Sequence, residues 1–298
     1  MRICLLTYRG NMFCGGQGIY VYYLAKSLSN LGHEVHVMAG PPYPSVPEGV
    51  RLHKISGLNL YETEGLSSLG RPGYLLNPLN FYEVLGKQLG MFPEIFTFSM
   101  RAYLKLREIM ADRPFDIIHD NQTLGYGLLM AKGLGAPVIA TIHHPIFIDM
   151  KADLAQAKRF LSKCRRMFFY SFLVMQHIVA RHMDRVITVS QCSAHDTMSV
   201  FKLREDKVRI VPNGIDTAVF ARREDVAKEP NSIVMVANTE DRKKGVVFLL
   251  RALQMLSGQV DARLSIIDRH GDYTRYAPRL VREHGLEDRV HFTGRLTV

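Results

Sequence analysis

A glycine-rich segment follows the first apolar run of the chain. Residues 14–18 read Cys-Gly-Gly-Gln-Gly and lie between a predicted strand at 2–7 and a predicted helix at 17–31. Glycines let backbone N–H groups approach an anion closely, and the start of a helix adds the positive end of its dipole. Gly15 and Gly16 are therefore candidate phosphate-binding residues, with a flexible turn as the alternative.

This segment does not match the motifs that bind dinucleotides. Gly16 and Gly18 supply the first two glycines of GxGxxG, but Val21 stands where the third belongs. The motif also needs an acidic residue about 20 positions further on to hold the ribose. Residues 38–40 are Met-Ala-Gly at that place, and the chain has no GxxxxGK[ST] phosphate loop.

Polar side chains follow two later predicted strands. His119 and Asn121 stand at the end of one strand, and His143 and His144 follow the next. Ligands of open parallel sheets bind outside the carboxyl ends of the strands, where an imidazole can donate to a hydroxyl or phosphate or carry a proton. We expect His143 to be functional and His144 to face solvent. Metal binding is not expected, because acidic neighbours are few and no HExxH motif occurs.

A second candidate phosphate site lies late in the chain. Residues 242–245 are Arg-Lys-Lys-Gly and open a predicted apolar helix. Cations and a glycine at a helix start favour phosphate binding, which makes Arg242 and Lys244 candidates. A solvated charged turn is the alternative. Asn213, in a Pro-Asn-Gly turn, is a further candidate for lining a cleft.

Strands alternate with helices along the chain, which predicts parallel sheets with right-handed crossovers. The predicted strands are 2–7, 34–39, 50–55, 115–120, 136–142, 185–190 and 207–211, then 232–237, 262–267 and 289–293. The predicted helices are 17–31, 95–111, 123–133, 151–182, 192–200, 245–257 and 273–285. Residues 56–93 show no clean period, and residues 217–230 suit a linker.

The length of 298 residues suggests two domains. We place one domain at 1–216, and a linker with a partial second domain at 217–298. The second part holds about three strands, so we expect a fragment or an early-terminated product.

The 4 cysteines are scattered, which disfavours zinc and disulfides, and no apolar run reaches the roughly 18 residues that span a bilayer. We expect a cytoplasmic protein.

The net charge of +10 is concentrated in the second half of the chain. Residues 1–150 hold 12 basic and 11 acidic side chains, and residues 151–298 hold 26 and 17. This excess suggests an anionic partner. The segment 158–185 combines basic residues with an apolar run, and we expect a long, mostly buried helix. The alternative is peripheral association with the inner face of an anionic membrane. Nucleic acid is not expected, because no recognition motif is present.

The ordered set of motifs resembles glycosyltransferase family 4, which has the GT-B fold. The matching pieces are Gly15-Gly16, LxxLGHEVHV at 28–37, FDIIH at 115–119, VIATIHH at 138–144, DRVITVS at 184–190, VRIVPNGIDTAVF at 208–220, and KKG at 243–245 followed by LLRAL at 249–253. The resemblance implies an α/β protein of two Rossmann-like, doubly wound parallel-sheet domains that face each other across a cleft, the second incomplete.

The resemblance also implies the activity: a hexosyltransferase that moves a sugar, with retention, from a nucleotide-diphosphate donor to a hydroxyl of a glycan, lipid or small molecule. The resemblance implies that the domain at 1–216 binds the acceptor and that the partial domain at 217–298 binds the donor. No metal or bound cofactor is implied. Gly15, Gly16 and Lys244 match positions that contact phosphate, and His143 matches a histidine near the reacting sugar. His119, Asn121 and Asn213 are expected to line the acceptor side or the cleft. No protein nucleophile is implied.

Two positions depart from the family pattern. Ala237-Asn238 stands where the family usually has Gly-Arg, and Arg242 or Lys243 is a hypothetical substitute for the missing arginine. Asp268 stands where the family often has glycine. Two alternatives follow: a catalytically impaired module that binds nucleotide sugars, and an NAD(P)-dependent oxidoreductase, which the missing acidic residue after the second strand disfavours.

Overall fold

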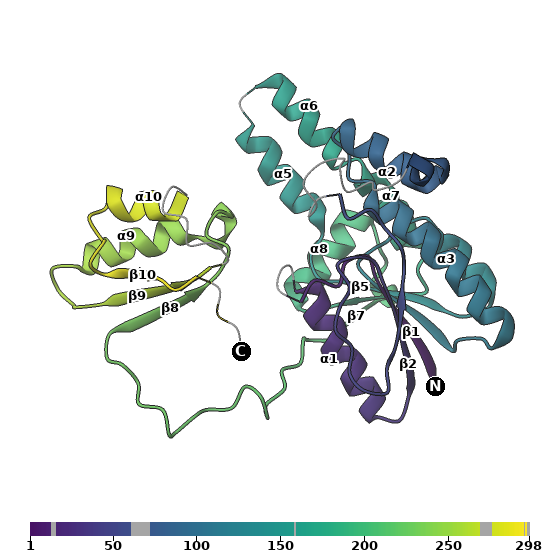
Figure 1. Ribbon diagram of the computed structural model, residues 1–298, viewed down its shortest axis with the longest axis horizontal. Helices are drawn as coiled ribbons and strands as arrows, with labels where there is room; N and C mark the ends of the chain where they lie inside the picture. The colour runs from purple at the N-terminus through teal and green to yellow at the C-terminus, as the bar shows by residue number, and fades with distance from the viewer. Residues whose placement is uncertain (13–15, 61–71, 158, 269–275, 295, 297–298) are drawn as a thin grey trace. The chain divides into compact units, whose positions relative to one another are not determined.

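The computed structural model describes residues 1–12, 16–60, 72–157, 159–268, 276–294 and 296. The chain folds into two compact units, Met1–Thr217 and Ala218–Val298. Each is built on a parallel sheet (Figure 1). The division follows Thr217, beside the predicted boundary after residue 216. Gly15 lies outside the described residues.

The first unit alternates strands and helices as the sequence predicts. Its strands are β1 (Arg2–Thr7), β2 (Glu34–Ala39), β3 (Arg51–Lys54), β4 (Ile117–Asn121), β5 (Val138–Ile142), β6 (Arg185–Thr188) and β7 (Val208–Ile210). Its α-helices are α1 (Gln17–Asn30), α2 (Pro78–Gln88), α3 (Glu94–Asp112), α4 (Gly127–Ala131), α5 (Ile146–Gln156), α6 (Phe160–Phe169), α7 (Phe172–His182) and α8 (Gln191–Phe201). Short 3-10 turns are η2 (Pro72–Leu76), η3 (Lys132–Leu134) and η4 (Glu205–Lys207).

The seven-stranded sheet has the order β3-β2-β1-β4-β5-β6-β7, and every neighbouring pair is parallel. The chain moves outward from β1 to β3 and then returns to β4 on the other side of β1. The direction of winding therefore reverses between β1 and β4, and this reversal creates the crevice in which doubly wound sheets bind ligands.

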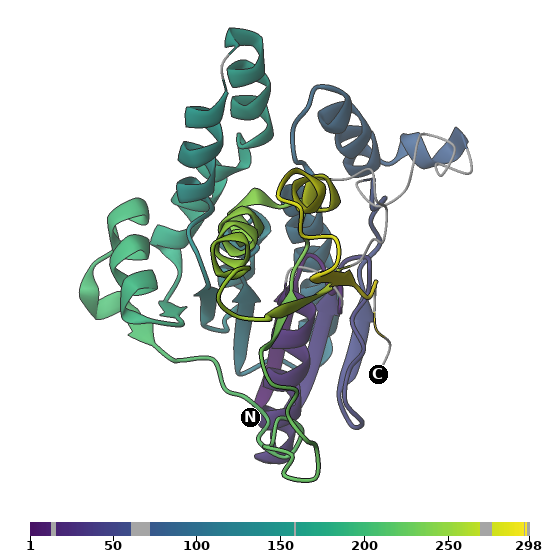
Figure 2. The same cartoon turned by 90° about the vertical axis from the view of Figure 1, so that its left-hand side faces the viewer.

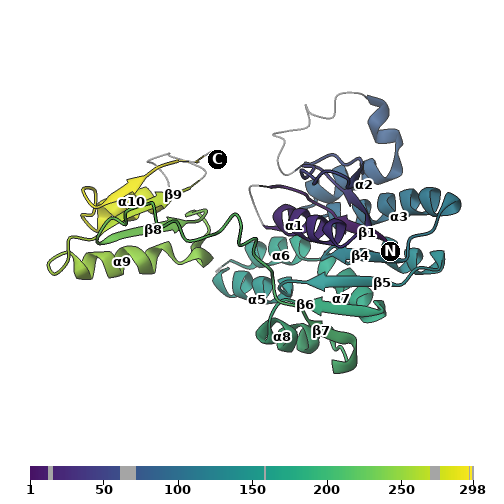
Figure 3. The same cartoon turned by 90° about the horizontal axis from the view of Figure 1, so that it is seen from below.

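Helices cover both faces of this sheet, so its strands are apolar on both sides (Figure 3). Successive side chains of a strand point to opposite faces. Leu5 therefore belongs to a buried cluster with Val21 of α1, and Leu6 to a separate cluster with Ile95 of α3 and Val179 of α7.

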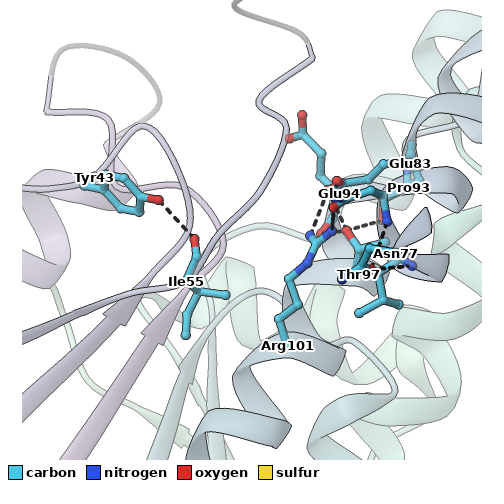
Figure 4. Close-up of polar contacts among 10 residues, drawn as sticks. Tyr43, Ile55, Asn77, Glu83, Pro93, Glu94, Thr97 and Arg101 are labelled. Carbon is cyan, nitrogen blue, oxygen red and sulfur yellow. Dashed lines mark hydrogen bonds and ion pairs between the residues drawn. The ribbon is translucent and has the colours of Figure 1, made fainter. Parts of the chain in front are cut away.

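Helix α2 lies in the region where the sequence shows no period. Its attachment to α3 runs through Glu83, whose side chain is buried (Figure 4). Glu83 accepts a hydrogen bond from the Thr97 hydroxyl at 2.7 Å and pairs with Arg101 at 3.2 Å. Arg101 also donates to the Asn80 side chain at 2.7 Å. Removal of one partner of a buried ion pair would leave the other charge buried without a partner. The contact between Glu83 and Arg101 therefore fixes α2 on α3.

The prediction of one long helix over most of 151–182 is wrong. The chain forms α5, α6 and α7 instead. Ala157 has an extended backbone (φ −80°, ψ 110°) that ends α5, and Arg159 is extended before α6 begins. A second break at Tyr170 and Ser171 separates α6 from α7. The second break lies within the apolar run 167–175, which carries no periodic signal that would reveal it.

The prediction that 158–185 is mostly buried is wrong for α6 and correct for α7. Six residues of α7 are buried, whereas α6 has none. Helices α5 and α6 lie side by side and project from the sheet, as two perpendicular views show (Figures 1 and 2). The break at 170–171 returns the chain to the core.

The second unit holds a three-stranded parallel sheet among its described residues, in the order β10-β9-β8. Its elements are β8 (Ser232–Val236), η5 (Arg242–Lys244), α9 (Val246–Leu256), β9 (Arg263–Ile267), α10 (Tyr276–Glu283) and β10 (Val290–Phe292). Leu250 and Leu253 of α9 form a buried core with Leu264 of β9 and Val281 of α10. The preceding residues, 217–231, are exposed and contain no helix or strand.

Candidate functional site

A pocket of about 380 Å³ lies in the first unit, beside the carboxyl ends of β4 and β5. This is the location expected for a ligand, next to the point where the winding of the sheet reverses. Its lining residues are Gly16, Gln17, Tyr20, Gln122, His143, His144, Ile146 and Asn213. Three of the residues predicted from the sequence, Gly16, His143 and Asn213, therefore share one pocket although they lie far apart in the chain.

His143 follows β5 and is fixed by its neighbours. Its Nε2 lies 2.8 Å from Oδ1 of Asn121, and the edge-on ring of Tyr20 packs against the imidazole at a centroid distance of 4.5 Å. The Asn121 amide donates to the carbonyl of Gln17 at 3.5 Å, so its Oδ1 is the acceptor for the imidazole. Nε2 therefore carries the proton and Nδ1 is the acceptor. Within the described part of the chain, no hydrogen bond to Nδ1 is found.

Gln122 positions the loop that carries His143. Its side-chain oxygen accepts from the His143 amide at 2.8 Å, and its side-chain amide donates to the His144 carbonyl at 2.6 Å. Gln122 has a φ of 55° and Leu124 a φ of 50°, in the left-handed region that such residues rarely adopt. Strain of this kind persists where the surroundings over-determine it, often at functional sites. On the other side of the loop, the Ser193 hydroxyl donates to the His143 carbonyl at 2.8 Å.

His119 and Asn121 are buried and do not line the pocket. They support it from within the sheet. Nε2 of His119 lies 2.7 Å from the hydroxyl of Thr141, and the hydroxyl of Tyr20 lies 3.3 Å from the same oxygen. Asn121 holds His143, so both residues act on the pocket through their neighbours.

Burial determines the charge of these groups. It lowers the pKa of His143 and lowers that of His119 to about 4, with the nearby His143 contributing to the second shift. Burial raises the pKa of Asp120, next to His119, to about 7, and its Oδ1 has no hydrogen-bond partner. Both imidazoles are therefore neutral at pH 7, which suits hydrogen bonding to a hydroxyl group better than anion binding.

Gly16 opens α1 in the left-handed conformation, with a φ of 71° and no side-chain cap on the helix. The first N–H groups of α1 thus begin at the edge of the pocket, the arrangement that favours anions. Gly18 has a different, steric requirement. A Cβ at Gly18 would lie 2.4 Å from the carbonyl oxygen of Gly10 and 2.5 Å from that of Asn11.

A larger groove of about 680 Å³ adjoins Gly16 and Tyr20 along α1. Its other wall is the segment 211–217, which contains the predicted Asn213. Lys26 of α1 pairs with Asp216 at 2.9 Å and holds the two walls together. Asn213 lines both hollows and marks the place where they adjoin.

The second unit repeats the left-handed glycine at a helix start. Gly245 has a φ of 75° before α9, again without a side-chain cap. Lys244 precedes it and is exposed, and its amide donates to the carbonyl of Asp241 at 2.9 Å. Arg242 lies in the same 3-10 turn. Lys244 and Gly16 belong to different units.

The two positions that depart from the family pattern have structural roles. Asn238 accepts from the amide of Glu240 at 3.1 Å and thereby caps the turn after β8. Asp268 is buried at the end of β9 and accepts hydrogen bonds from the amide and the hydroxyl of Thr239. Asp268 therefore fixes the loop that leads to Lys244.

The sequence singled out His143 and Gly16 but missed Tyr20, Gln122 and Thr141. Tyr20 stands in the first turn of a helix that follows a glycine run, and Gln122 stands just after a strand. The positions of Tyr20 and Gln122 next to a helix start and a strand end were the signal in the sequence that could have identified them. Among the described residues, no three His, Cys, Asp or Glu side chains group as metal ligands. No helix in that part of the chain is long and apolar enough to cross a membrane.

Comparison with known proteins identifies related sequences over the whole chain. The family described as Glycosyltransferase Family 4 matches residues 14–219. The MMP α-(1→4)-mannosyltransferase of Mycolicibacterium hassiacum is 37% identical over 303 residues, which cover 100% of this chain and 71% of that protein. An uncharacterized glycosyltransferase of Methanocaldococcus jannaschii is 23% identical over 309 residues, which cover 99% of this chain and 69% of that protein.

Solved structures share the fold. The sucrose-phosphate synthase of Thermosynechococcus elongatus matches with a TM-score of 0.64 at 17% identity, over 99% of this chain and 71% of that one. Anabaena HepE, solved in complex with UDP and glucose, matches with a TM-score of 0.58 at 14% identity, over 100% of this chain and 70% of that one. These neighbours are GT-B glycosyltransferases, and the two parallel-sheet units are of the same type.

Proposed function

The chain belongs to glycosyltransferase family 4, and from that premise we propose that it transfers a sugar, with retention, from a nucleotide-diphosphate donor to a hydroxyl acceptor. That it is a glycosyltransferase follows from its relatives; the donor and the stereochemistry are the proposal. The observation that supports it best is the pocket shared by Gly16, His143 and Asn213. The pocket combines an uncapped helix N-terminus, which suits a diphosphate, with a neutral histidine, which suits a sugar hydroxyl.

The proposed reaction breaks the bond between the anomeric carbon and the diphosphate. The acceptor oxygen bonds to the same face of that carbon, and its proton passes to a phosphate oxygen. Negative charge grows on the leaving group, so aligned amides and cations lower the barrier. The start of α1 at Gly16 can supply amides, and Lys244 with the start of α9 can supply a cation and further amides.

His143 is proposed to orient the donor sugar. With Nε2 committed to Asn121, its Nδ1 can accept a hydrogen bond from a sugar hydroxyl. A fixed acceptor of this kind holds the anomeric carbon in line for the acceptor oxygen. No side chain is assigned as a nucleophile.

The donor sugar is proposed to be mannose. The name of the relative that is 37% identical specifies mannosyl transfer with an α-(1→4) linkage. An α-linked product from an α-linked nucleotide sugar corresponds to retention. We further propose that the reaction takes place in the cytoplasm and needs no metal ion. An unchanged rate in excess EDTA would support the absence of a metal requirement. A rate that is lost with EDTA and restored by Mg²⁺ would overturn it.

Titration calorimetry with nucleoside diphosphates and their mannose conjugates tests the donor site. We predict that Lys244→Ala weakens binding by about 1.5–3 kcal/mol, the contribution of a hydrogen bond to a charged group. Lys228→Ala, in the exposed linker, is the control and should bind like the parent. Equal affinity in both variants would contradict the phosphate role of Lys244. Donor binding without any transfer would favour the impaired binding module.

A further inference from the structure

Helix α6 exposes its apolar side chains instead of burying them. Phe160 and Leu161 are 78% and 80% exposed, and Met167 and Phe168 are 61% and 56% exposed. These four residues are spaced i, i+1, i+7 and i+8, so they lie on one face of the helix. Isolated apolar residues on a surface are ordinary, but four large ones on one face of a ten-residue helix form a patch.

The opposite face of α6 carries Ser162, Arg166 and Phe169 and turns toward the protein. Arg166 donates to the backbone carbonyl of Asp153 in α5, and the Tyr170 hydroxyl donates to the Asp153 carboxylate. Ser162 and Arg166 are each less exposed than the four apolar residues. Helix α5 therefore holds α6 with the face formed by Phe160, Leu161, Met167 and Phe168 outward.

Cations border the apolar face. Lys163 and Arg165 lie within α6, Arg159 is its N-cap, and all three are exposed. Residues 157–170 contain no Asp or Glu. Among the described residues, no ion pair engages any of the three cations. The face thus presents apolar and positively charged groups together.

The neighbouring segment extends this surface. The ring of Phe92 lies 5.6 Å from that of Phe169 at the end of α6, and a Cβ at Gly90 would lie 3.8 Å from Arg165. Leu89, at the end of α2, is 58% exposed beside this contact. Figures 1 and 2 show α2 and the α5–α6 pair at the same end of the unit.

We propose that α6 is an interfacial helix that docks the enzyme on a bilayer containing anionic phospholipid. Its four apolar side chains enter the headgroup boundary, and Arg159, Lys163 and Arg165 contact lipid phosphates. Charge favours this occupant over a second copy of the chain. Two copies of α6 placed face to face would bring like charges together, whereas an anionic surface complements them.

Docking would hold the candidate site near the membrane. Helix α5 begins at Ile146, which lines the pocket, and ends at Gln156, just before α6. Eleven helical residues span about 16 Å at 1.5 Å per residue. The pocket would thus stand within about 16 Å of the anchored helix, in reach of a hydroxyl acceptor displayed by a lipid headgroup.

The absence of tryptophan from the sequence permits a direct test. Phe168→Trp introduces a single indole on the proposed docking face, and Phe248→Trp, on the exposed surface of α9, is the matched control. With vesicles of phosphatidylcholine and one third phosphatidylglycerol, we expect a blue shift of the indole emission of Phe168→Trp that high salt reverses, and none from the control. Vesicles of pure phosphatidylcholine should give a much smaller shift.

Co-sedimentation of the full chain with the same vesicles supplies the second readout. Lys163→Gln with Arg165→Gln should lower the partition coefficient by roughly tenfold or more, since each cation near an anionic surface contributes a factor of about five. Arg222→Gln with Lys228→Gln, in the exposed linker, should leave it unchanged. Leu161→Ser with Phe168→Ser should also reduce binding, with circular dichroism to check that the fold is kept.

Absence of vesicle binding by the parent chain, or equal binding by all variants, would overturn the proposal. A dimer in sedimentation equilibrium that Leu161→Ser with Phe168→Ser dissociates, without vesicle binding, would instead assign this face to a second copy. Neither readout depends on donor or turnover, so failure here is separate from failure of the proposed sugar transfer.

Discussion

At the scale of single residues, the hydrogen bonds that the candidate site can offer a ligand depend on which ring nitrogen of His143 carries the proton. Asn121 Oδ1 accepts from Nε2 at 2.8 Å, and burial lowers the pKa of the imidazole. The ring is thus a neutral acceptor at Nδ1 near neutral pH. The pair of His143 and Asn121 can be perturbed without changing the size of either side chain.

We predict that Asn121→Asp shifts the acid limb of the pH–rate profile to higher pH. A carboxylate at this position would stabilise the imidazolium and raise the pKa of His143, so Nδ1 would remain protonated closer to neutral pH. The measurement is kcat/KM from about pH 5 to about pH 9, the range that brackets an imidazole pKa. Asn121→Ala should lower the rate without moving the acid limb upward. The same limb in the parent and in Asn121→Asp would contradict a role for the neutral imidazole.

His119 and Asp120 make opposite contributions to stability. The pKa of His119 is lowered to about 4 in the fold, so its contribution is lost as pH falls from the ordinary value near 6.5 toward 4. The pKa of Asp120 is raised to about 7, so its contribution is present below the ordinary value near 4 and is lost as pH rises through 7. The two slopes oppose each other over the same range.

Replacing Asp120 separates these contributions. We predict that Asp120→Asn gains stability relative to the parent as pH rises from about 4 to about 7, by up to a few kcal/mol. Denaturant unfolding at several pH values measures this difference. Asp112→Asn, on the exposed end of α3, should differ from the parent by a nearly constant amount. A difference for Asp120→Asn that is equally constant would show that Asp120 is ionised in the fold throughout.

At the scale of elements, the glycine run before α1 serves two purposes. Gly16 has the left-handed backbone that opens the helix start, whereas Gly18 allows the chain at Gly10 and Asn11 to pass close to α1. The sequence predicts the first purpose from the placement of the run after a strand. The second purpose depends on a loop that returns to the helix, which a local pattern does not reveal.

We predict that Gly18→Ala destabilises the first unit by about 1–3 kcal/mol, the usual cost of overpacking. The added methyl would meet a backbone carbonyl at 2.4 Å, and backbone cannot rotate away. Gly133→Ala is the matched control, because a Cβ there meets nothing within 4 Å. Thermal unfolding of both variants gives the comparison. A parent-like midpoint for Gly18→Ala would mean that the contact with Gly10 is absent.

Sequence periodicity predicted most strands and helices within a few residues, because an alternation of buried strands and one-sided helices leaves a clear pattern. It failed over the predicted helix at 151–182, where the apolar run 167–175 crosses the break between α6 and α7. The sequence also does not distinguish apolar side chains that the core covers, as in α7, from apolar side chains that are exposed, as in α6. The residues that support His143 were missed for a related reason: Gln122 and Tyr20 act through contacts distant in sequence.

At the scale of the whole molecule, the two units divide the expected chemistry. Met1–Thr217 contains the pocket with Gly16, His143 and Asn213, and Ala218–Val298 contains Lys244 and the left-handed Gly245 before α9. Both units place a glycine at an uncapped helix start after a first strand. This repetition is the physical basis for proposing that each unit can bind phosphate at the start of a helix.

The central claim is that sugar transfer takes place at the pocket that contains His143. Proton NMR of the full chain incubated with a nucleotide-diphosphate mannose and a hydroxyl acceptor measures both rate and anomeric configuration. We predict an α-linked product from the parent and from His195→Ala, an exposed control on α8, and at least a roughly tenfold lower kcat for His143→Ala. A β-linked product, or His143→Ala with the rate of the parent, would contradict the account.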